Sequence, residues 1–307
     1  MKKNNDIIII GAGPAGLTAA IYAARAGKSV LVFEAKTFGG QITSATTVVN
    51  YPGIKEISGS DYAYELYEQA TSFGAEVKFE KVIDVDVEGN IKIVKTKEKN
   101  YKTKALILAT GAFSRPLGLD GEEKYIGKGV SYCATCDGNF FKKQDVAIVG
   151  GGDTALTDAI YLAGMCKKVY IVHRRDTFRG SESYVRKLKK LDNVEFILNS
   201  QVTKLIGRNK LEKIEITDND DNKYTIEVNG LFIAIGQVPE NGNFKELIDV
   251  DDAGYFEADE DCHTKIPGIF VAGDSRIKTL RQLTTAVGDG SVAATEACDY
   301  LDALDED

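Results

Sequence analysis

The sequence predicts an α/β protein made of two similar units. An apolar run over 6–10 leads into Gly11-Ala12-Gly13-Pro14-Ala15-Gly16, and a second run over 145–149 leads into Gly150-Gly151-Gly152-Asp153-Thr154-Ala155. A buried strand followed by a glycine-rich turn and a helix is typical of a βαβ unit that binds a dinucleotide. Because the pattern occurs twice, we expect a duplicated nucleotide-binding fold.

Composition limits the class of protein. The chain has 307 residues, of which 43% are apolar, and this is enough for two domains with cores. The formal net charge of −8 argues against nucleic acid and anionic membranes as partners. No apolar run is long enough to span a bilayer, and the run at 7–10 is too short for a signal peptide. The five cysteines have no framework spacing, which indicates a reducing, cytoplasmic location.

The first unit has each part of the nucleotide fingerprint in order. We expect a small-residue helix over 17–26 and a second strand over 30–33, which ends on Glu34. The glycines at 11, 13 and 16 let the backbone and the helix start approach a pyrophosphate, while Glu34 accepts ribose hydroxyls.

The remaining elements follow in the same alternation. In the first unit we expect loops at 39–41 and 50–53, a helix at 60–73, a β-ribbon at 77–94 and a buried strand at 105–111. In the second unit we expect a helix ending at Ala163 and strands at 169–172 and 231–236. A strand at 269–274 and a helix from 281 to 301 most simply complete the first unit, and 302–307 is expected to be a solvated acidic tail.

The two fingerprints differ at the residue that meets the ribose. Counting 23 residues from the first glycine reaches Glu34 in the first unit and His173 in the second. The second unit continues with Arg174, Arg175 and Arg179. A carboxylate repels a ribose 2′-phosphate, whereas guanidinium groups bind it with paired hydrogen bonds. The second unit is therefore expected to bind NADPH and the first a nucleotide with a free ribose, such as FAD; a solvated basic face is the competing interpretation.

Between the fingerprints lies Cys133-Ala134-Thr135-Cys136-Asp137-Gly138. Two cysteines three residues apart can close a small disulfide, and in a reducing compartment such a pair is redox-active or binds a metal. A structural zinc site needs four ligands. The other candidates form no second pair; they are Cys166, Cys262, His263 and Cys298. We therefore expect a redox pair and no metal, with Asp137 either as its proton donor and acceptor or as a cap of the next turn.

With these motifs the whole chain resembles low-molecular-weight thioredoxin reductases, a class of pyridine nucleotide-disulfide oxidoreductase. The matching residues run through the chain in family order: Gly11–Gly16, Cys133–Gly138, His173-Arg174-Arg175 with Arg179, Gly273-Asp274 and Arg281-Gln282. The resemblance implies an α/β fold of two Rossmann-like domains, the second inserted into the first. The FAD-binding domain would comprise 1–113 and 241–307, and the NADPH-binding domain, which carries the redox-active disulfide, would comprise 114–240.

The resemblance also implies the binding residues. For FAD they are Gly11, Gly13, Ala15, Gly16, Glu34, Gly40, Gln41, Asn50, Gly273, Asp274, Arg281 and Gln282. For NADPH they are Gly150, Gly152, Asp153, Thr154, Ala155, His173, Arg174, Arg175 and Arg179. Arg281 and Gln282 would open a helix whose positive end stabilises reduced flavin. The chain departs from the family at Thr157-Asp158, where two glutamates are usual, and at Gln237, where histidine is common.

The activity that the resemblance implies is thioredoxin-disulfide reduction. Electrons would pass from NADPH through FAD to Cys133 and Cys136 and then to thioredoxin. Cys136 would exchange with the flavin, Cys133 would attack thioredoxin and Asp137 would carry the proton. Lys128, Phe140 and Phe141 match positions where the family meets thioredoxin, and the family likeness implies a homodimer.

A hinge is expected because the disulfide and the NADPH site share one domain, and both must reach a flavin in the other. The linkers at 112–116 and 236–241 would act as hinges for this rotation.

Three alternative functions stay open. One is a reductase of this fold fed by another donor such as ferredoxin, which the arginines disfavour. Another is a reductase that acts on a different disulfide acceptor, such as a peroxiredoxin-coupled reductase. Such reductases normally carry an extra N-terminal domain, for which we expect no room before Gly11. The third is a non-catalytic flavin-binding sensor.

Overall fold

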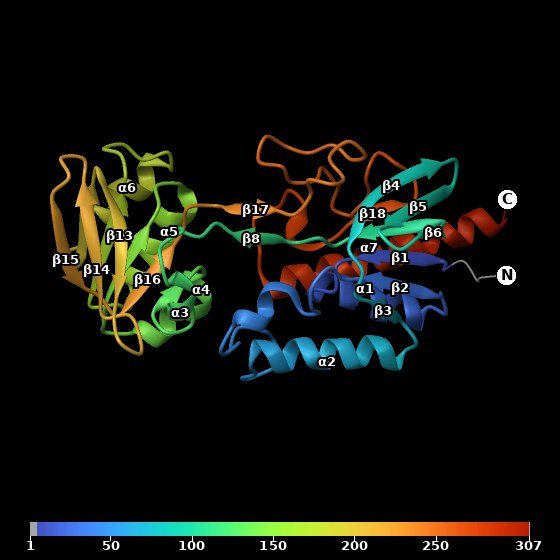
Figure 1. Cartoon of the computed structure of the whole chain (residues 1–307), viewed down its shortest axis with the longest axis horizontal. Helices are drawn as coiled ribbons and strands as arrows, with labels where there is room; N and C mark the ends of the chain where they lie inside the picture. The colour runs from blue at the N-terminus through green and yellow to red at the C-terminus, as the bar shows by residue number, and fades with distance from the viewer. Residues whose placement is uncertain (1–4, 307) are drawn as a thin grey trace. The chain divides into compact units, whose positions relative to one another are not determined.

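The computed structural model describes residues 5–306. These residues form two compact units (Figure 1). Unit 1 contains the chain up to Phe113 and from Val238 onward, and unit 2 is the continuous stretch Ser114–Gln237. The expected α/β class with Rossmann-like parallel sheets is confirmed. Which nucleotide each unit binds stays a prediction.

Unit 1 is built on a parallel sheet in the order β18-β7-β1-β2-β3. Its strands are β1 (Ile7–Ile10), β2 (Val30–Phe33), β3 (Glu76–Lys78), β7 (Ala105–Leu108) and β18 (Ile269–Val271). β1, β2, β7 and β18 are buried along their whole length, as expected of a parallel sheet covered on both faces. The expected ribbon at 77–94 is thus divided. Its first part joins this sheet as β3, and the rest forms an antiparallel sheet of β4 (Val82–Glu88), β5 (Ile91–Thr96) and β6 (Asn100–Thr103).

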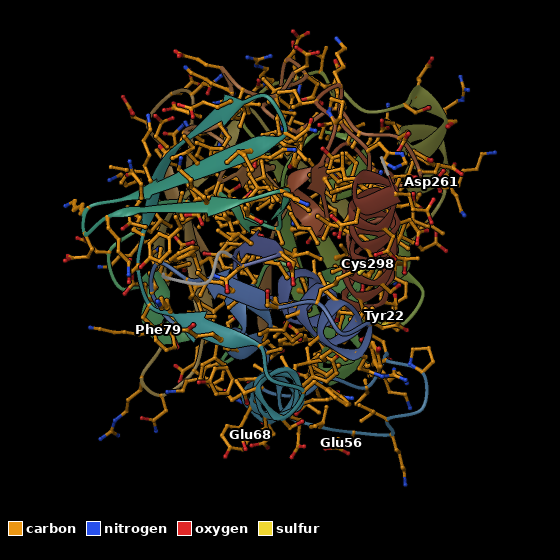
Figure 2. All side chains as sticks on the ribbon, turned by 90° about the vertical axis from the view of Figure 1, so that its right-hand side faces the viewer. Tyr22, Glu56, Glu68, Phe79, Asp261 and Cys298 are labelled. Atoms are coloured by element: carbon orange, nitrogen blue, oxygen red, sulfur yellow. A yellow bond between two sulfur atoms is a disulfide. The ribbon has the colours of Figure 1, made fainter. Side chains whose placement is uncertain are left out.

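Small residues bring two helices of unit 1 close together. Helix α1 (Pro14–Arg25) packs against the C-terminal helix α7 (Leu283–Glu306); Figure 2 marks the pair by Tyr22 and Cys298. A Cβ on Gly290 would stand 2.2 Å from the carbonyl oxygen of Ala15, so only glycine fits this crossing. The small-residue pattern of α1 therefore serves both the fingerprint turn and the contact with α7.

Three expected boundaries in unit 1 were wrong. Helix α1 begins at Pro14, so the fingerprint's last residues already lie in its first turn. Helix α7 begins at Leu283, so Arg281 and Gln282 precede it. The acidic end is exposed, as expected, but helical: α7 continues to Glu306, Asp302 pairs with Lys28, and Asp305 Oδ1 lies 2.7 Å from Lys104 Nζ. Asp307 lies outside the described residues. The other helical elements are η1 (Gly40–Ser44), α2 (Gly59–Ser72) and η3 (Gly273–Ser275).

Unit 2 repeats the parallel sheet in the order β9-β16-β10-β11-β12. Its strands are β9 (Val130–Ser131), β10 (Asp145–Val149), β11 (Lys168–His173), β12 (Val194–Leu198) and β16 (Gly230–Ile233). Its helical elements are α3 (Glu122–Tyr125), α4 (Ala134–Asp137), η2 (Gly138–Phe141), α5 (Asp153–Ala163) and α6 (Glu182–Leu188). An antiparallel sheet of β13 (Ser200–Ile206), β14 (Lys213–Asp218) and β15 (Lys223–Glu227) lies before β16 in the chain.

The edge strands β18 and β9 come from different parts of the chain relative to the fingerprint of their sheet. In unit 1 the edge strand β18 comes from the C-terminal part of the chain, whereas in unit 2 the edge strand β9 precedes the fingerprint strand β10. Both edge strands lead directly into a segment of the predicted site, because Asp274 follows β18 and Cys133 follows β9. Each segment therefore lies at the carboxyl edge of its sheet, where ligands of such folds bind.

The chain passes between the units twice, and the two connecting strands pair. β8 (Ala112–Ser114) and β17 (Gln237–Pro239) form a two-stranded sheet. Hydrogen bonds flank it, from Arg115 N to Gly236 O at 3.0 Å and from Glu240 N to Gly111 O at 3.1 Å. Among helices within residues 5–306, none is long and apolar enough to cross a membrane.

Candidate functional site

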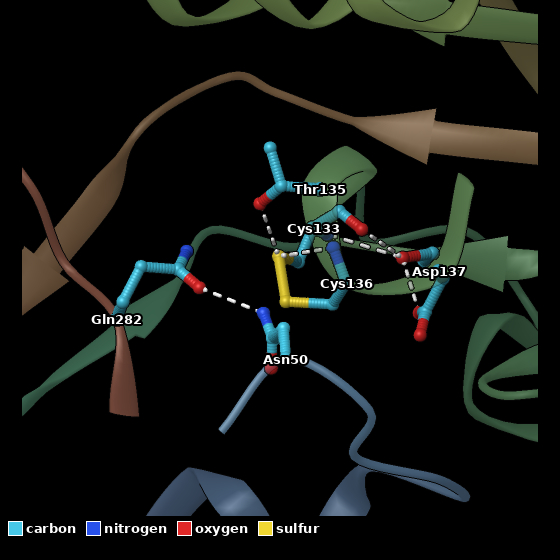
Figure 3. Close-up of a disulfide and its surroundings, with 7 residues drawn as sticks. Asn50, Cys133, Thr135, Cys136, Asp137 and Gln282 are labelled. Carbon is cyan, nitrogen blue, oxygen red and sulfur yellow. Dashed lines mark hydrogen bonds between the residues drawn. A yellow bond between two sulfur atoms is a disulfide. The ribbon is translucent and has the colours of Figure 1, made fainter. Parts of the chain in front are cut away.

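The structure joins Cys133 and Cys136 in a disulfide at the start of the short helix α4 (Figure 3). Cys133 is the N-cap, and its Sγ accepts a hydrogen bond from the backbone N–H of Cys136 at 3.2 Å. The hydroxyl of Thr135 lies 3.4 Å from the same sulfur. Both contacts favour negative charge on Cys133, because a thiolate is a better hydrogen-bond acceptor than a thiol.

Asp137 is held beside the disulfide by a serine that the sequence analysis missed. Ser131, at the end of β9, donates its hydroxyl hydrogen to Asp137 Oδ2 at 2.6 Å. Burial raises the pKa of the Asp137 carboxyl, and the Ser131 hydrogen bond partly offsets that rise. A serine two residues before the first cysteine is the only sequence signal that could have indicated it.

The segment around the disulfide is anchored on both sides. Tyr132 donates its hydroxyl to the buried carboxylate of Glu122 at 2.5 Å, and Glu122 also accepts the backbone N–H groups of 117–119. On the other side, a Cβ on Gly138 would meet Tyr161 and Leu162 of α5 at 3.1 Å. The turn that carries the cysteines is thus fixed to the sheet edge and to α5.

The first fingerprint, in unit 1, has the shape that a pyrophosphate needs. A Cβ on Gly11 would stand 2.2 Å from the carbonyl oxygen of Ala109, so the turn passes directly over β7. Nothing lies within 4 Å of a Cβ on Gly13, which leaves open space at the start of α1. The Glu34 carboxylate accepts backbone N–H groups from Ala12 at 3.0 Å and Lys36 at 2.9 Å. These contacts hold it at the end of β2, where the fold places a ribose.

Asp274 has an unsatisfied atom. Its Oδ1 is buried and has no hydrogen-bond partner within residues 5–306, and burial raises the pKa of the carboxyl. A buried oxygen without a partner is costly, so the arrangement suits a ligand that donates a hydrogen bond there, such as a sugar-alcohol hydroxyl.

The loop that carries Asp274 is tied to α7 through Asp289, another residue that the sequence analysis missed. Asp289 Oδ2 accepts from Gly273 N at 2.9 Å, Arg276 Nε at 2.9 Å and Lys278 Nζ at 2.7 Å. The two cations hold the pKa of the Asp289 carboxyl below its ordinary value, although burial alone would raise it. A carboxylate with three donors fixes the backbone on which Asp274 depends.

Arg281 and Gln282 are brought to the same loop. The Arg281 guanidinium donates to the carbonyl oxygens of Asp274 and Arg276 at 3.3 and 3.1 Å and lies 3.9 Å above the Tyr255 ring. Gln282 Oε1 accepts from Asn50 Nδ2 at 3.2 Å (Figure 3). Residues 50 and 282, far apart in sequence, therefore meet within unit 1, and Arg281 organises the loop backbone.

In the second fingerprint, His173 is not a free ligand. Its ring is buried, stacks on Phe178 with 5.0 Å between ring centres, and lies 3.0 Å from Thr177 O through Nε2. A carbonyl oxygen only accepts, so Nε2 carries the proton. Burial and the nearby arginines lower the pKa of His173, which keeps the imidazole neutral near pH 7. His173 thus packs beneath the arginine loop, defined as residues 174–181, and its part in binding NADPH stays a prediction.

The arginine loop is fastened to the fingerprint turn. Arg179 N donates to Gly151 O at 2.8 Å, and Ser181 N donates to Asp153 Oδ1 at 2.7 Å. The side chains of Arg174, Arg175 and Arg179 are exposed. Asp153 thus holds the loop, while the three guanidinium groups are free to meet an anion at the carboxyl edge of unit 2.

Of the three residues expected to contact thioredoxin, two lie at the surface and one packs inside unit 2. Phe140 is 51% exposed, whereas Phe141 packs on Phe232 with 5.4 Å between ring centres, so only Phe140 and Lys128 are surface residues of that group. Thr157 is exposed, and burial raises the pKa of Asp158 to about 6. The other cysteines, Cys166, Cys262 and Cys298, are free and buried. No group of three or more potential metal ligands occurs in residues 5–306.

Comparisons with known proteins agree with this geometry. Residues 5–290 match the family described as pyridine nucleotide-disulphide oxidoreductase. A thioredoxin reductase from Peptoclostridium acidaminophilum is 44% identical, over 99% of each chain. The crystal structure of thioredoxin reductase from Streptococcus pyogenes MGAS5005 is 42% identical, with a TM-score of 0.94 over 99% of this chain and 100% of that one. Thioredoxin reductase from Lactococcus lactis in its FR conformation is 37% identical, with a TM-score of 0.68 over 98% and 100%.

Proposed function

The chain belongs to the pyridine nucleotide-disulphide oxidoreductases, and within them to the thioredoxin reductases, and we propose that it reduces thioredoxin with electrons from NADPH. The observation that carries the proposal is the Cys133–Cys136 disulfide at a sheet edge, with Asp137 held beside it by Ser131. The acceptor is thioredoxin or a thioredoxin-like protein, as the names of the relatives suggest, and the enzyme works as a cytoplasmic homodimer.

The residues of unit 1 fit FAD. The open space at Gly13 suits a pyrophosphate, Glu34 suits a ribose with free hydroxyls, and the buried Oδ1 of Asp274 suits a ribityl hydroxyl. The loop from Gly273 to Gln282, with Asn50, would surround the flavin. When bound, FAD supplies a carrier that takes a hydride from a nicotinamide and reduces a disulfide.

The residues of unit 2 fit NADPH. Gly152 leaves open space at the start of α5 for the pyrophosphate, since a Cβ there would meet only Arg179, at 4.0 Å. Arg174, Arg175 and Arg179 would bind the 2′-phosphate, because planar guanidinium groups donate paired hydrogen bonds to phosphate oxygens. No carboxylate stands where Glu34 stands in unit 1, which favours NADPH over NADH.

The cysteines perform the exchange step. The disulfide takes up two electrons and two protons and becomes a dithiol; Asp137, which Ser131 holds beside the pair and whose pKa burial raises, delivers one of them. Cys133 then attacks the acceptor disulfide as a thiolate, supported by Cys136 N–H and Thr135. Cys136 resolves the mixed disulfide, the acceptor leaves as a dithiol, and Cys133–Cys136 is oxidised again.

A rotation of unit 2 about its linkers would let the disulfide and the nicotinamide use one flavin in turn. The paired strands β8 and β17 offer two adjacent pivots. The solved relatives from Streptococcus and Lactococcus differ far more in TM-score than in identity to this chain. Such a spread is expected if thioredoxin reductases place their two units differently in different structures.

The test uses Cys136→Ser with Cys166→Ser as the matched control. We expect both proteins to bind FAD and to be yellow, but only the control should reduce thioredoxin with NADPH. A yellow wild-type protein that leaves NADPH unoxidised would point instead to a flavin-binding sensor or to another donor such as ferredoxin. Thioredoxin reduction by Cys136→Ser at the wild-type rate would overturn the assignment.

A further inference from the structure

The Ser131 hydroxyl contacts both Asp137 and the backbone of Cys133. We propose that the Ser131 hydroxyl is a two-state hydrogen-bond switch that keeps Asp137 satisfied both with and without its proton, and so positions it for proton delivery. The inference rests on the proposed function, because it concerns the acid that serves the Cys133–Cys136 pair.

The geometry supplies three partners to a single oxygen. Ser131 Oγ lies 2.6 Å from Asp137 Oδ2, 3.1 Å from the backbone nitrogen of Cys133 and 3.3 Å from the carbonyl oxygen of Cys133. A hydroxyl has one hydrogen to donate and two lone pairs that accept. The Cys133 N–H fills one lone pair, so the single hydrogen goes either to Asp137 Oδ2 or to the Cys133 carbonyl oxygen, and the second lone pair can accept from a protonated Asp137.

The two arrangements follow from this count. When Asp137 is a carboxylate, Ser131 donates its hydrogen to Oδ2. When Asp137 carries a proton, its O–H donates to Ser131 Oγ, and the serine hydrogen turns to the Cys133 carbonyl. The Cys133 carbonyl also accepts from the backbone N–H of Asp137 at 3.1 Å, so each of these polar groups keeps a partner in both states. This matters because an unpaired buried group is costly. Only the hydroxyl rotates, so Asp137 stays in place while its charge changes.

Ser131 is suited to this role by its burial and by the absence of competitors. It is 4% exposed, so water does not readily replace it. Burial and the Ser131 hydrogen bond account for the shift of the Asp137 pKa, with no charged side chain contributing. The titratable groups on the packed elements are Tyr132 after β9 and Asp153, Asp158 and Tyr161 on α5; Cys133, the N-cap of α4, and Cys136 join them only when the disulfide is reduced.

The test compares Ser131→Ala with Ser131→Thr, which restores the hydroxyl, in the full-length protein with FAD bound. Ser200→Ala is the matched control: Ser200 is also 4% exposed, lies in the same unit and donates to a backbone carbonyl, Leu198 O, at 2.8 Å. Asp158→Asn removes the titration of that half-buried acid, so that its contribution can be told apart from that of Asp137. Each variant is measured for thioredoxin reduction across pH. The Asp137 carboxyl carbon is titrated by NMR in ¹³C-aspartate protein, with Asp137→Asn used to assign the signal.

For Ser131→Ala we expect kcat to fall about tenfold, since the acid remains but is no longer held. The Asp137 titration should move to higher pH, because the hydrogen bond that opposes the effect of burial is lost. Ser131→Thr should recover both, and Ser200→Ala and Asp158→Asn should leave the Asp137 titration in place. An unchanged Asp137 titration and pH profile in Ser131→Ala would overturn the switch.

The NMR titration needs no turnover, which keeps the two proposals separable. If the wild-type protein fails to reduce thioredoxin but the Asp137 titration shifts in Ser131→Ala, the switch is supported and the proposed function is refuted. If the wild-type protein reduces thioredoxin and Ser131→Ala behaves identically, the proposed function is supported and the switch is refuted.

Discussion

The imidazole of His173 lies so close to Gly151 that a Cβ built on Gly151 would stand 2.1 Å from its Cε1 atom. The ring cannot move away easily, because Phe178 stacks on it and the Thr177 carbonyl binds its Nε2. This contact joins the fingerprint turn to the arginine loop, so a change at Gly151 should affect nucleotide binding.

Gly151→Ala should displace His173 and with it the arginine loop. We expect the KM for NADPH to rise about tenfold or more, with little change in kcat, since the lost interaction is binding rather than chemistry. Gly164→Ala, where a Cβ meets its nearest atom at an ordinary 3.4 Å, is the control. Steady-state kinetics measure both, and an unchanged KM in Gly151→Ala would show that the contact is dispensable.

Arg179→Ala should lower the preference for NADPH over NADH. A hydrogen bond to a charged group contributes about 1.5–3 kcal/mol, so kcat/KM for NADPH should fall about 10- to 100-fold while that for NADH stays constant. Arg208→Ala, at an exposed arginine of the same unit, controls for loss of one positive charge. Equal losses with both nucleotides would mean that Arg179 does not read the 2′-phosphate.

Asp137→Asn should separate disulfide chemistry from nucleotide oxidation. Thioredoxin reduction should slow about 100-fold, because the amide cannot deliver a proton. NADPH oxidation by ferricyanide, which bypasses the cysteines, should persist. Asp192→Asn, at an exposed acid in unit 2, is the comparison variant. If Asp137 only caps the turn, the variant will keep its thioredoxin activity and lose stability instead.

Lys92 should make stability rise with pH. Its side chain is fully buried, donates to Lys104 O at 2.9 Å and has no carboxylate partner among residues 5–306; burial lowers its pKa from 10.5 to about 8. Between these pH values the unfolded chain binds the proton more tightly than the folded protein does. The free energy of unfolding therefore gains about 3 kcal/mol as pH rises from 8 to 10.5.

Lys92→Met removes this titration. Denaturant unfolding across that pH range, with FAD saturating, should show the stability of wild type rising relative to Lys92→Met. The exposed Lys102→Met variant should follow the wild type. Parallel curves for wild type and Lys92→Met would mean that Lys92 stays charged in the folded protein.

The parts predicted from sequence are those that local chemistry dictates. The first fingerprint was recognisable because Gly11 and Gly16 stand where any Cβ would collide with backbone, and because Glu34 must end the second strand. The fully buried strands were equally clear, since continuous apolar runs bounded by glycine allow few other structures.

The parts that could not be predicted depend on contacts between distant residues. β9 has only two residues, too few for any periodic pattern, although it positions the disulfide. The helical acidic end depends on Lys28 and Lys104, more than 200 positions away. The burial of His173 depends on Phe178 and Gly151, and a basic motif alone gives no sign of it.

The origin of the two edge strands sets an order for synthesis on the ribosome. Unit 2 draws every strand of its sheet from the stretch that ends at Gln237, whereas unit 1 waits for β18 and α7. At 5–20 residues per second, the 46 residues from Gln237 to the start of α7 at Leu283 (283 minus 237) take about 2 to 9 s to be added. The cysteine motif is therefore complete before the loop of Asp274 exists, and during that interval its redox state depends on the thiols and disulfides around the nascent chain.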